Sequence, residues 1–93
     1  MIFEELLEKN PKALIWEGFD QAYIGYTYSH IEKEPVAVYD YYTMLDLVID
    51  GIFETEDNVT DDEAFNLAIE HLDYNVIGGS LGEFTPVVMY KDG

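Results

Sequence analysis

The chain contains no cysteine and no arginine among its 93 residues, and it carries only four lysines. Without cysteine it can form neither a disulfide framework nor a thiolate metal site, and a reducing compartment suits it. It also lacks an apolar run long enough to cross a bilayer, and acidic residues stand near the N-terminus where a signal peptide would carry positive charge. These absences predict a cytoplasmic protein that neither spans a membrane nor enters the secretory route.

Positive charge is missing altogether from residues 34–90, which contain 13 of the 20 acidic residues. Proteins bind a phosphate backbone, or the headgroups of anionic lipids, mainly through lysine and arginine. With a formal net charge of −16, the composition therefore predicts no direct contact with nucleic acid or with a membrane. It favours a basic protein as the partner, and it leaves a homodimer open.

Apolar residues, in contrast, are plentiful, because 48% of the chain is hydrophobic and 15% is aromatic. This content is too high for a disordered acidic tail, so the chain is expected to fold. No linker or internal repeat interrupts the sequence, and its length is that of one small domain. We expect a single acidic domain over residues 1–93.

The hydrophobic pattern predicts an α+β fold. Four strands are expected where β-branched and aromatic residues are concentrated, at residues 13–17, 23–28, 36–39 and 85–90. A short N-terminal helix is expected at residues 2–9, and two main helices at residues 40–53 and 60–72. The expected architecture is a four-stranded, largely antiparallel sheet, in which the first two strands pair as a hairpin and both main helices pack on one face.

Local signals mark the beginnings of the two main helices. Asp40 is placed to cap the first helix, and Thr60 with Glu63 matches the capping box that opens the second. The buried stripe of the second helix is predicted from residues at helical spacing, namely Phe65, Ala68, Ile69 and Leu72. Three glycines between residues 75 and 82 predict a loop after this helix.

Acidic side chains on the main helices and their connection are the first candidates for function. Asp46, Asp50 and Glu54 recur every four residues, so their carboxylates lie about 6 Å apart along a helix axis. Like charges at this spacing destabilise a helix by a few tenths of a kcal/mol per pair. One interpretation is a surface that imitates a nucleic-acid backbone; the other is a solvated face that keeps a small protein soluble.

Two leucines bear on the choice between these interpretations. Leu47 and Leu67 fall away from the apolar stripes of their helices on a helical wheel. Either they are exposed among carboxylates, as at many interfaces, or they pack against another helix. The predicted partner-binding residues are nine acids and these two leucines, namely Asp46, Asp50, Glu54, Glu56, Asp57, Asp61, Asp62, Glu63, Glu70, Leu47 and Leu67.

Tyrosine suggests a different kind of interface. Eight tyrosines are present, and several cluster near the second and third expected strands, Tyr26 and Tyr28 among them. Tyrosine is common at interfaces because it brings a large area and a polar tip, but it is also a good strand residue. The alternative function is therefore a structural or assembly accessory that binds through a tyrosine-rich strand edge, with the charge serving solubility.

Catalysis and metal binding have little support in the sequence. The acidic run that begins at Asp57 lacks the central glycine and final glutamate of an EF-hand loop. No serine lies in a nucleophile-elbow pattern. A small hydrolase or small-molecule binder would need a deep pocket that joins His30 or His71 to a carboxylate. We predict that the protein is not an enzyme and binds no metal or cofactor.

Several short motifs resemble a group of small proteins of unassigned function encoded by tailed bacteriophages. The matching residues are Gly18-Phe19-Asp20 with Ala22 and Ile24-Gly25, Val38-Tyr39-Asp40-Tyr41, Glu63-Ala64, Asn75-Val76 with Gly78, Gly82-Glu83 and Thr85-Pro86. The resemblance implies a phage origin and a setting in the host cytoplasm, and it supplies no catalytic residue. Residues 26–35 depart from the pattern, because such proteins carry basic residues and a Cys-Gly-Gln-Pro-like turn there.

These observations lead to one functional hypothesis. The protein is predicted to be a non-enzymatic, phage-encoded binding protein whose acidic helical face engages a basic surface of a host protein. A defence nuclease or another nucleic-acid-binding protein would suit the charge.

Overall fold

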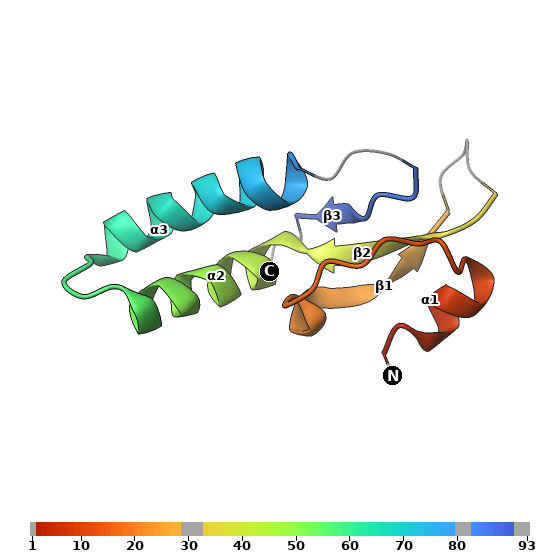
Figure 1. Ribbon diagram of the computed structural model, residues 1–93, viewed down its shortest axis with the longest axis horizontal. Helices are drawn as coiled ribbons and strands as arrows, with labels where there is room; N and C mark the ends of the chain where they lie inside the picture. The colour runs from red at the N-terminus through yellow and green to blue at the C-terminus, as the bar shows by residue number, and fades with distance from the viewer. Residues whose placement is uncertain (1, 29–32, 80–82, 91–93) are drawn as a thin grey trace.

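A computed structural model describes residues 2–28, 33–79 and 83–90 of the chain. The elements follow one another along the chain as α1 (Glu4–Lys9), η1 (Asp20–Ala22), β1 (Tyr23–Thr27), β2 (Val36–Asp40), α2 (Tyr41–Thr55), α3 (Asp61–Glu70), η2 (His71–Ile77) and β3 (Val87–Met89) (Figure 1). The fold is α+β, as expected. His30 lies outside the described residues, as does the part of the glycine-rich stretch at residues 80–82.

In the described part of the chain, the sheet contains three strands in the order β1-β2-β3. Its first pair is antiparallel, with an irregularity in register between Tyr23 and Gly25, where the glycine has a φ of 146°. Its second pair, β2 with β3, is parallel and aligns Val38 with Val87. The expectation of four largely antiparallel strands is therefore wrong, and the protein has a three-stranded mixed sheet.

The missing strand is the segment at residues 13–17, which crosses the sheet without joining it. Its backbone N–H groups find other partners, since Leu14 donates to the Phe84 carbonyl at 3.3 Å and Trp16 to the Tyr39 hydroxyl at 3.1 Å. Ala13 is buried, while Ile15 and Trp16 pack against the core. The apolar residues that predict a strand thus serve to cover the sheet.

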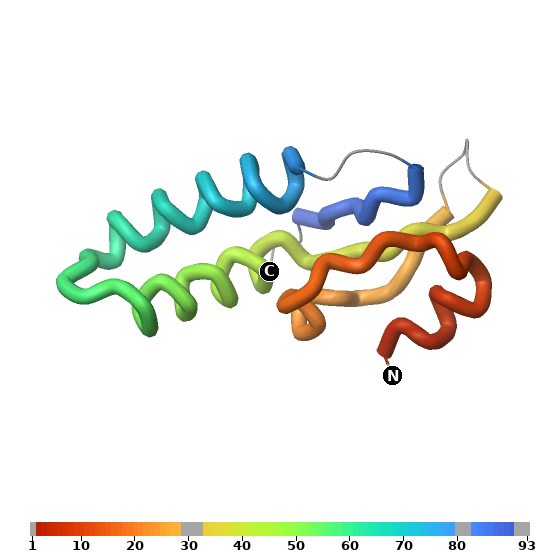
Figure 2. Tube along the Cα trace, viewed as in Figure 1, coloured from red at the N-terminus to blue at the C-terminus, as the bar shows by residue number. Residues whose placement is uncertain are grey.

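The parallel pairing of β3 follows from the path of the chain between β2 and β3. α2 leads away from the sheet and α3 returns beside it, so the chain comes back past the sheet before β3 begins (Figure 2). Parallel neighbours need a long crossover of this kind, whereas antiparallel neighbours need only a short turn. The two helices supply that crossover.

The main helices do not cover a face of the sheet, which is a second correction to the expected architecture. α2 and α3 form a hairpin that extends beyond the end of the sheet, and the structure measures 47 × 25 × 25 Å (Figure 1). One face of the sheet is covered instead by α1 and the segment after it. There Tyr39 is fully buried, with ring centroids of Trp16 and Tyr23 at 5.1 and 5.8 Å.

The buried side of α3 is formed mainly by small side chains. Ala64, Ala68 and Leu72 are buried at four-residue spacing along α3 and η2. Phe65, predicted to lie in the buried stripe, is 46% exposed. The prediction is wrong at this residue because alanine lets two helices approach closely, and the face with Ala64 and Ala68 turns inward in place of the phenylalanine.

The N-terminal ends of α3 and α2 bear on the two capping predictions. The prediction for α3 is confirmed in full, whereas for α2 only the position of the cap residue is confirmed. The Glu63 N–H donates to the Thr60 hydroxyl at 3.2 Å, and the Thr60 N–H donates to the Glu63 carboxylate at 3.3 Å, which completes the capping box. Asp40 occupies the N-cap of α2, but its carboxylate accepts from the Thr43 hydroxyl and not from a backbone N–H.

Beyond α3 the chain stays helical for longer than expected. Residues 75–77, predicted to be loop, belong to η2, a π-helix of seven residues. Its end is closed by the Gly78 N–H, which donates to the Asp73 carbonyl at 2.9 Å. In the described residues, the helices are too short or too polar to span a bilayer.

Candidate functional site

The acidic residues predicted to bind a partner are all exposed. On α2, Asp46 and Asp50 point away from the side that buries Met44 and Leu45. This position follows from helical geometry, because a four-residue step keeps side chains on one face. The other predicted acids are exposed on α2, on α3 or in the connection, namely Glu54, Glu56, Asp57, Asp61, Asp62, Glu63 and Glu70.

Three of these acids also have a structural reason for their positions. Asp61, Asp62 and Glu63 form the first turn of α3, where negative charge interacts favourably with the helix dipole. Glu63 is in addition half of the capping box. The acids of α2 are different, because none of them lies in its first turn. The repeated carboxylates of α2 therefore bring no helix-dipole stabilisation and are the more informative set.

The two leucines fall in different environments. Leu47 is partly buried and packs against the hydrophobic core. Leu67 is 47% exposed on α3. Of the two alternatives, packing describes Leu47 and exposure among carboxylates describes Leu67.

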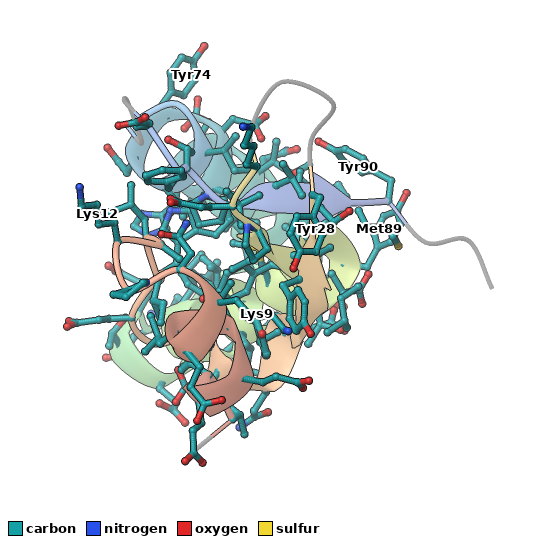
Figure 3. All side chains as sticks on the ribbon, turned by 90° about the vertical axis from the view of Figure 1, so that its right-hand side faces the viewer. Lys9, Lys12, Tyr28, Tyr74, Met89 and Tyr90 are labelled. Carbon is teal, nitrogen blue, oxygen red and sulfur yellow. The ribbon has the colours of Figure 1, made fainter. Side chains whose placement is uncertain are left out.

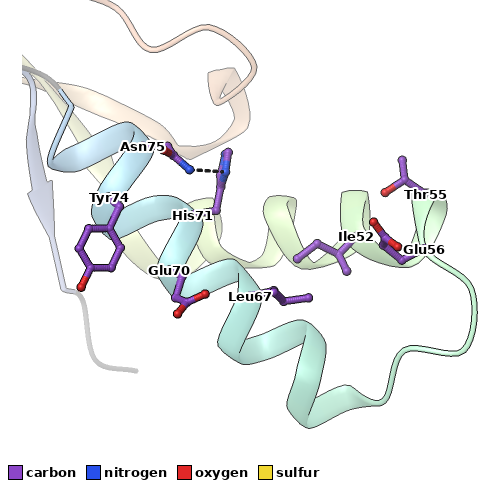
Figure 4. A pocket seen from close by; sticks show the side chains of 8 residues that line it. All are labelled: Ile52, Thr55, Glu56, Leu67, Glu70, His71, Tyr74 and Asn75. Atoms are coloured by element: carbon purple, nitrogen blue, oxygen red, sulfur yellow. Dashed lines mark hydrogen bonds between the residues drawn. The ribbon is translucent and has the colours of Figure 1, made fainter.

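Leu67 borders an open groove of about 550 Å³ between the two helices of the hairpin (Figure 4). α2 and the residue after it contribute Ile52, Thr55 and Glu56 to the groove. The residues that α3 and η2 contribute are Leu67, Glu70, His71, Tyr74 and Asn75. Seven of these eight residues are exposed and only Ile52 is partly buried, so the groove is a surface feature rather than an enclosed pocket.

The groove combines apolar and acidic side chains. In Figure 4, the labelled side chains of Ile52 and Leu67 lie between those of Glu56 and Glu70. On the η2 side, the His71 ring nitrogen and the Asn75 amide are 3.4 Å apart and share a hydrogen bond. This arrangement can hold an apolar group with positive charge on either side of it.

We did not predict this groove from the sequence, although the spacing of three residues in one of its walls is visible in the sequence. Leu67, Glu70 and Tyr74 are spaced by three and four residues, which places them on one side of a helix. The other wall of the groove forms only because α2 lies beside α3. The residues of η2 are placed by π-helical winding. Most π-helical segments in proteins are bulges of a single turn, and these often occur at functional sites. With seven residues, η2 is longer than such a bulge.

The groove gives little support to a catalytic interpretation. It does join His71 to Glu56 and Glu70, but all three side chains are exposed and the groove is open. A hydrolase or small-molecule site would require a deep pocket that excludes water from this histidine. Within residues 2–28, 33–79 and 83–90, no three His, Cys, Asp or Glu side chains are grouped to hold a metal ion.

A second candidate surface lies at the sheet. The rings of Tyr41, Tyr42 and Tyr90 form a cluster with centroid distances of 4.6, 5.7 and 6.3 Å. Burial raises the pKa of Tyr41, and the nearby Asp73 carboxylate adds to this effect. Met89 and Tyr90 are exposed at the end of β3 beside this cluster, whereas Tyr28 is exposed at the end of β1, the other outer strand of the sheet; all three are labelled in Figure 3. Tyr26 is partly buried beside Lys9, whose ammonium lies 5.9 Å from the ring centroid.

Comparisons of the chain with protein-family models, with curated proteins and with solved structures find no match. The site and its electrostatics are therefore the basis for a functional proposal.

Proposed function

We propose that this chain is a non-enzymatic binding protein, phage-encoded and active in the host cytoplasm, that engages a basic surface of a host protein through its α2–α3 hairpin. One observation carries the proposal. Nine carboxylates are exposed on a helical hairpin that extends beyond the sheet and contains no lysine or arginine. A host protein that binds nucleic acid offers the complementary charge.

Repulsion between the carboxylates of the hairpin makes binding of a basic partner electrostatically favourable. Carboxylates at four-residue spacing repel each other within α2, and no cation in the hairpin offsets that repulsion. A basic partner removes the repulsion on binding, speeds association by long-range attraction and rejects acidic competitors. Nucleic acid carries the same charge as the hairpin, so it would compete with this protein for the partner.

Neutralising the acids of α2 tests the proposal. The variant Asp46→Asn/Asp50→Asn/Glu54→Gln removes three charges from the hairpin, whereas Glu4→Gln/Glu5→Gln/Glu8→Gln removes three charges from α1 and serves as the control. Host proteins are captured on each immobilised chain, eluted in steps of NaCl and challenged with duplex DNA. We expect basic nucleic-acid-binding proteins on the parent and the control, lost at moderate salt and displaced by DNA.

The hairpin variant is expected to retain these proteins at least about tenfold less well than the control, which corresponds to about 1.4 kcal/mol. Retention that is insensitive to salt, or equal losses in both triple variants, would contradict the electrostatic account.

The exposed residues at the sheet favour a second candidate function, a structural accessory that binds through its tyrosine-rich strand edge. Tyr28, which follows β1, is more than half exposed, and its ring centroid lies 6.3 Å from that of Tyr26 in the same outer strand. The same capture with Tyr28→Ser separates the two candidates. If this variant loses the captured proteins and the hairpin variant keeps them, the strand edge is the binding site and the charge serves solubility.

A further inference from the structure

We propose that the groove between α2 and α3 binds one amphipathic helix of the partner, with aliphatic side chains against Ile52 and Leu67 and with lysine or arginine facing Glu56 and Glu70. This inference rests on the proposed function, because it specifies which part of a basic partner the hairpin would hold. The apolar surface, the charge and the shape of the groove each support it.

Apolar side chains of the groove are covered by water in the isolated chain. Leu67 is 47% exposed and Tyr74, seven residues further on, is 77% exposed. Both line the groove, and Ile52 faces it from α2. Apolar surface that lies beside a hollow and within an acidic border is typical of an interface, where an inserted side chain removes it from water.

The charge of the groove favours a basic occupant. Glu56 and Glu70 come from different elements and border the same groove. A neutral or acidic helix would desolvate these carboxylates without pairing them, which is unfavourable. A second copy of this hairpin is excluded by the same reasoning, because residues 41–77 carry no lysine or arginine. Lysine or arginine at the ends of an apolar stripe would pair with both carboxylates.

The shape of the groove favours a helix over an extended strand. The groove runs between two helices, and its walls expose side chains rather than unpaired backbone groups. A strand binds most strongly where it can continue a backbone ladder, whereas an amphipathic helix binds by laying an apolar stripe into a hydrophobic groove. A third helix packed on the hairpin would bury ridges of side chains in this groove.

The test uses two synthetic peptides of identical composition, each about four helical turns long. In the first, leucines at positions i and i+4 are bordered by lysines; in the second, the same residues are distributed so that no apolar stripe forms. Binding of each peptide to the ¹⁵N-labelled full chain is followed by chemical-shift changes and by calorimetry. We expect the striped peptide to bind at least about tenfold more tightly, with shifts concentrated at the groove residues.

Matched variants of the chain locate the peptide. Leu67→Ala removes an apolar wall of the groove, whereas Phe65→Ala removes an equally exposed side chain, 46% against 47%, from the same helix but outside the groove. Glu70→Gln removes a carboxylate that borders the groove, whereas Asp62→Asn removes an exposed one elsewhere on α3. We expect Leu67→Ala and Glu70→Gln to weaken binding of the striped peptide about tenfold, and their controls less than about twofold.

The outcomes separate this inference from the proposed function. If both peptides bind equally, lose affinity with salt and are unaffected by Leu67→Ala, the hairpin is a basic-partner surface but the groove is not its docking site. If neither peptide binds at low salt, both proposals are wrong. If the striped peptide binds in a way that depends on Leu67 but not on salt or Glu70, the groove is an apolar site and its charge specificity is refuted.

Discussion

Tyr39 illustrates how a single side chain holds the N-terminal segment against the sheet. It is fully buried in the central strand, its ring contacts Trp16 and Tyr23, and its hydroxyl accepts the Trp16 N–H. Burial raises the pKa of the Tyr39 hydroxyl above the ordinary value of 10.0, although the hydrogen bond from Trp16 acts in the opposite direction. Burial likewise raises the pKa of Tyr41. The protonated form is therefore part of the native core.

These raised pKa values predict that stability falls at high pH. Above pH 10.0 the unfolded chain releases its tyrosine protons while folded Tyr39 and Tyr41 retain theirs, so unfolding becomes more favourable as the pH rises. Below that pH the contribution is fully present. Urea unfolding from about pH 8 to about pH 11 measures the decline.

Tyr39→Phe provides the check on that assignment. It is expected to lower stability by about 1 kcal/mol at neutral pH, because a hydrogen bond is lost, and to make the decline above pH 10.0 shallower. Tyr74→Phe, which changes an exposed side chain, should leave the decline unchanged. Equal pH profiles for both variants would refute the role of Tyr39.

At the scale of elements, two glycines of the hairpin occupy opposite environments. Gly51 lies inside α2, and a Cβ atom built there meets nothing within 4 Å. Gly78 follows η2, where a Cβ atom would collide with the carbonyl oxygen of Asp73. That carbonyl accepts the Gly78 N–H, so the close approach belongs to the closure of the π-helix. The first glycine weakens its helix, and the second allows its helix to end as it does.

Alanine substitutions should therefore act in opposite directions. Gly51→Ala is expected to raise the free energy of unfolding by about 0.5–1 kcal/mol, because alanine loses less backbone entropy in a helix. Gly78→Ala is expected to lower it by about 1–3 kcal/mol and to weaken amide protection in η2. Thermal unfolding and hydrogen exchange measure both effects. A neutral Gly78→Ala with unchanged protection would mean that η2 does not depend on this glycine.

At the scale of the whole molecule, the protein is elongated and strongly charged. Its radius of gyration is 14.5 Å, whereas a compact chain of this length would have roughly 12 Å. The difference reflects the hairpin, which extends the molecule beyond the sheet. The hairpin residues 41–77 contain 10 acids and no lysine or arginine, so the extended part carries much of the net charge of −16. Self-repulsion of this kind opposes folding.

Salt is therefore expected to stabilise the protein. Raising the ionic strength from about 0.01 M to about 0.15 M shortens the Debye length from about 30 Å to about 8 Å and screens the repulsion between carboxylates. We expect a gain of about 1 kcal/mol, or about 4–8 °C in Tm, with a smaller gain in Asp46→Asn/Asp50→Asn/Glu54→Gln. Calorimetric melting in NaCl checks this. A Tm that stays constant or falls would show that self-repulsion does not limit stability.

Much of the local structure could be predicted from the sequence, because its causes lie within a few residues. The Thr60–Glu63 capping box, the helix that begins after Asp40 and the strand around Val38 all appear where they were expected. The exposure of the α2 acids also follows from helical spacing alone. Of the candidate site, the sequence predicted the charges and left open whether Leu67 is exposed or packed, and it did not predict the groove.

Propensity, capping and composition act locally, so the sequence alone specifies which segments can be helical, where two helices begin and how the charge is distributed. Long-range packing is responsible for three other features: residues 13–17 cross the sheet, β3 pairs in parallel with β2, and Phe65 turns outward while Leu47 turns inward. The groove was decided in the same way. Each of these depends on contacts between residues far apart in the chain, and no local pattern specifies which distant segment will supply the partner.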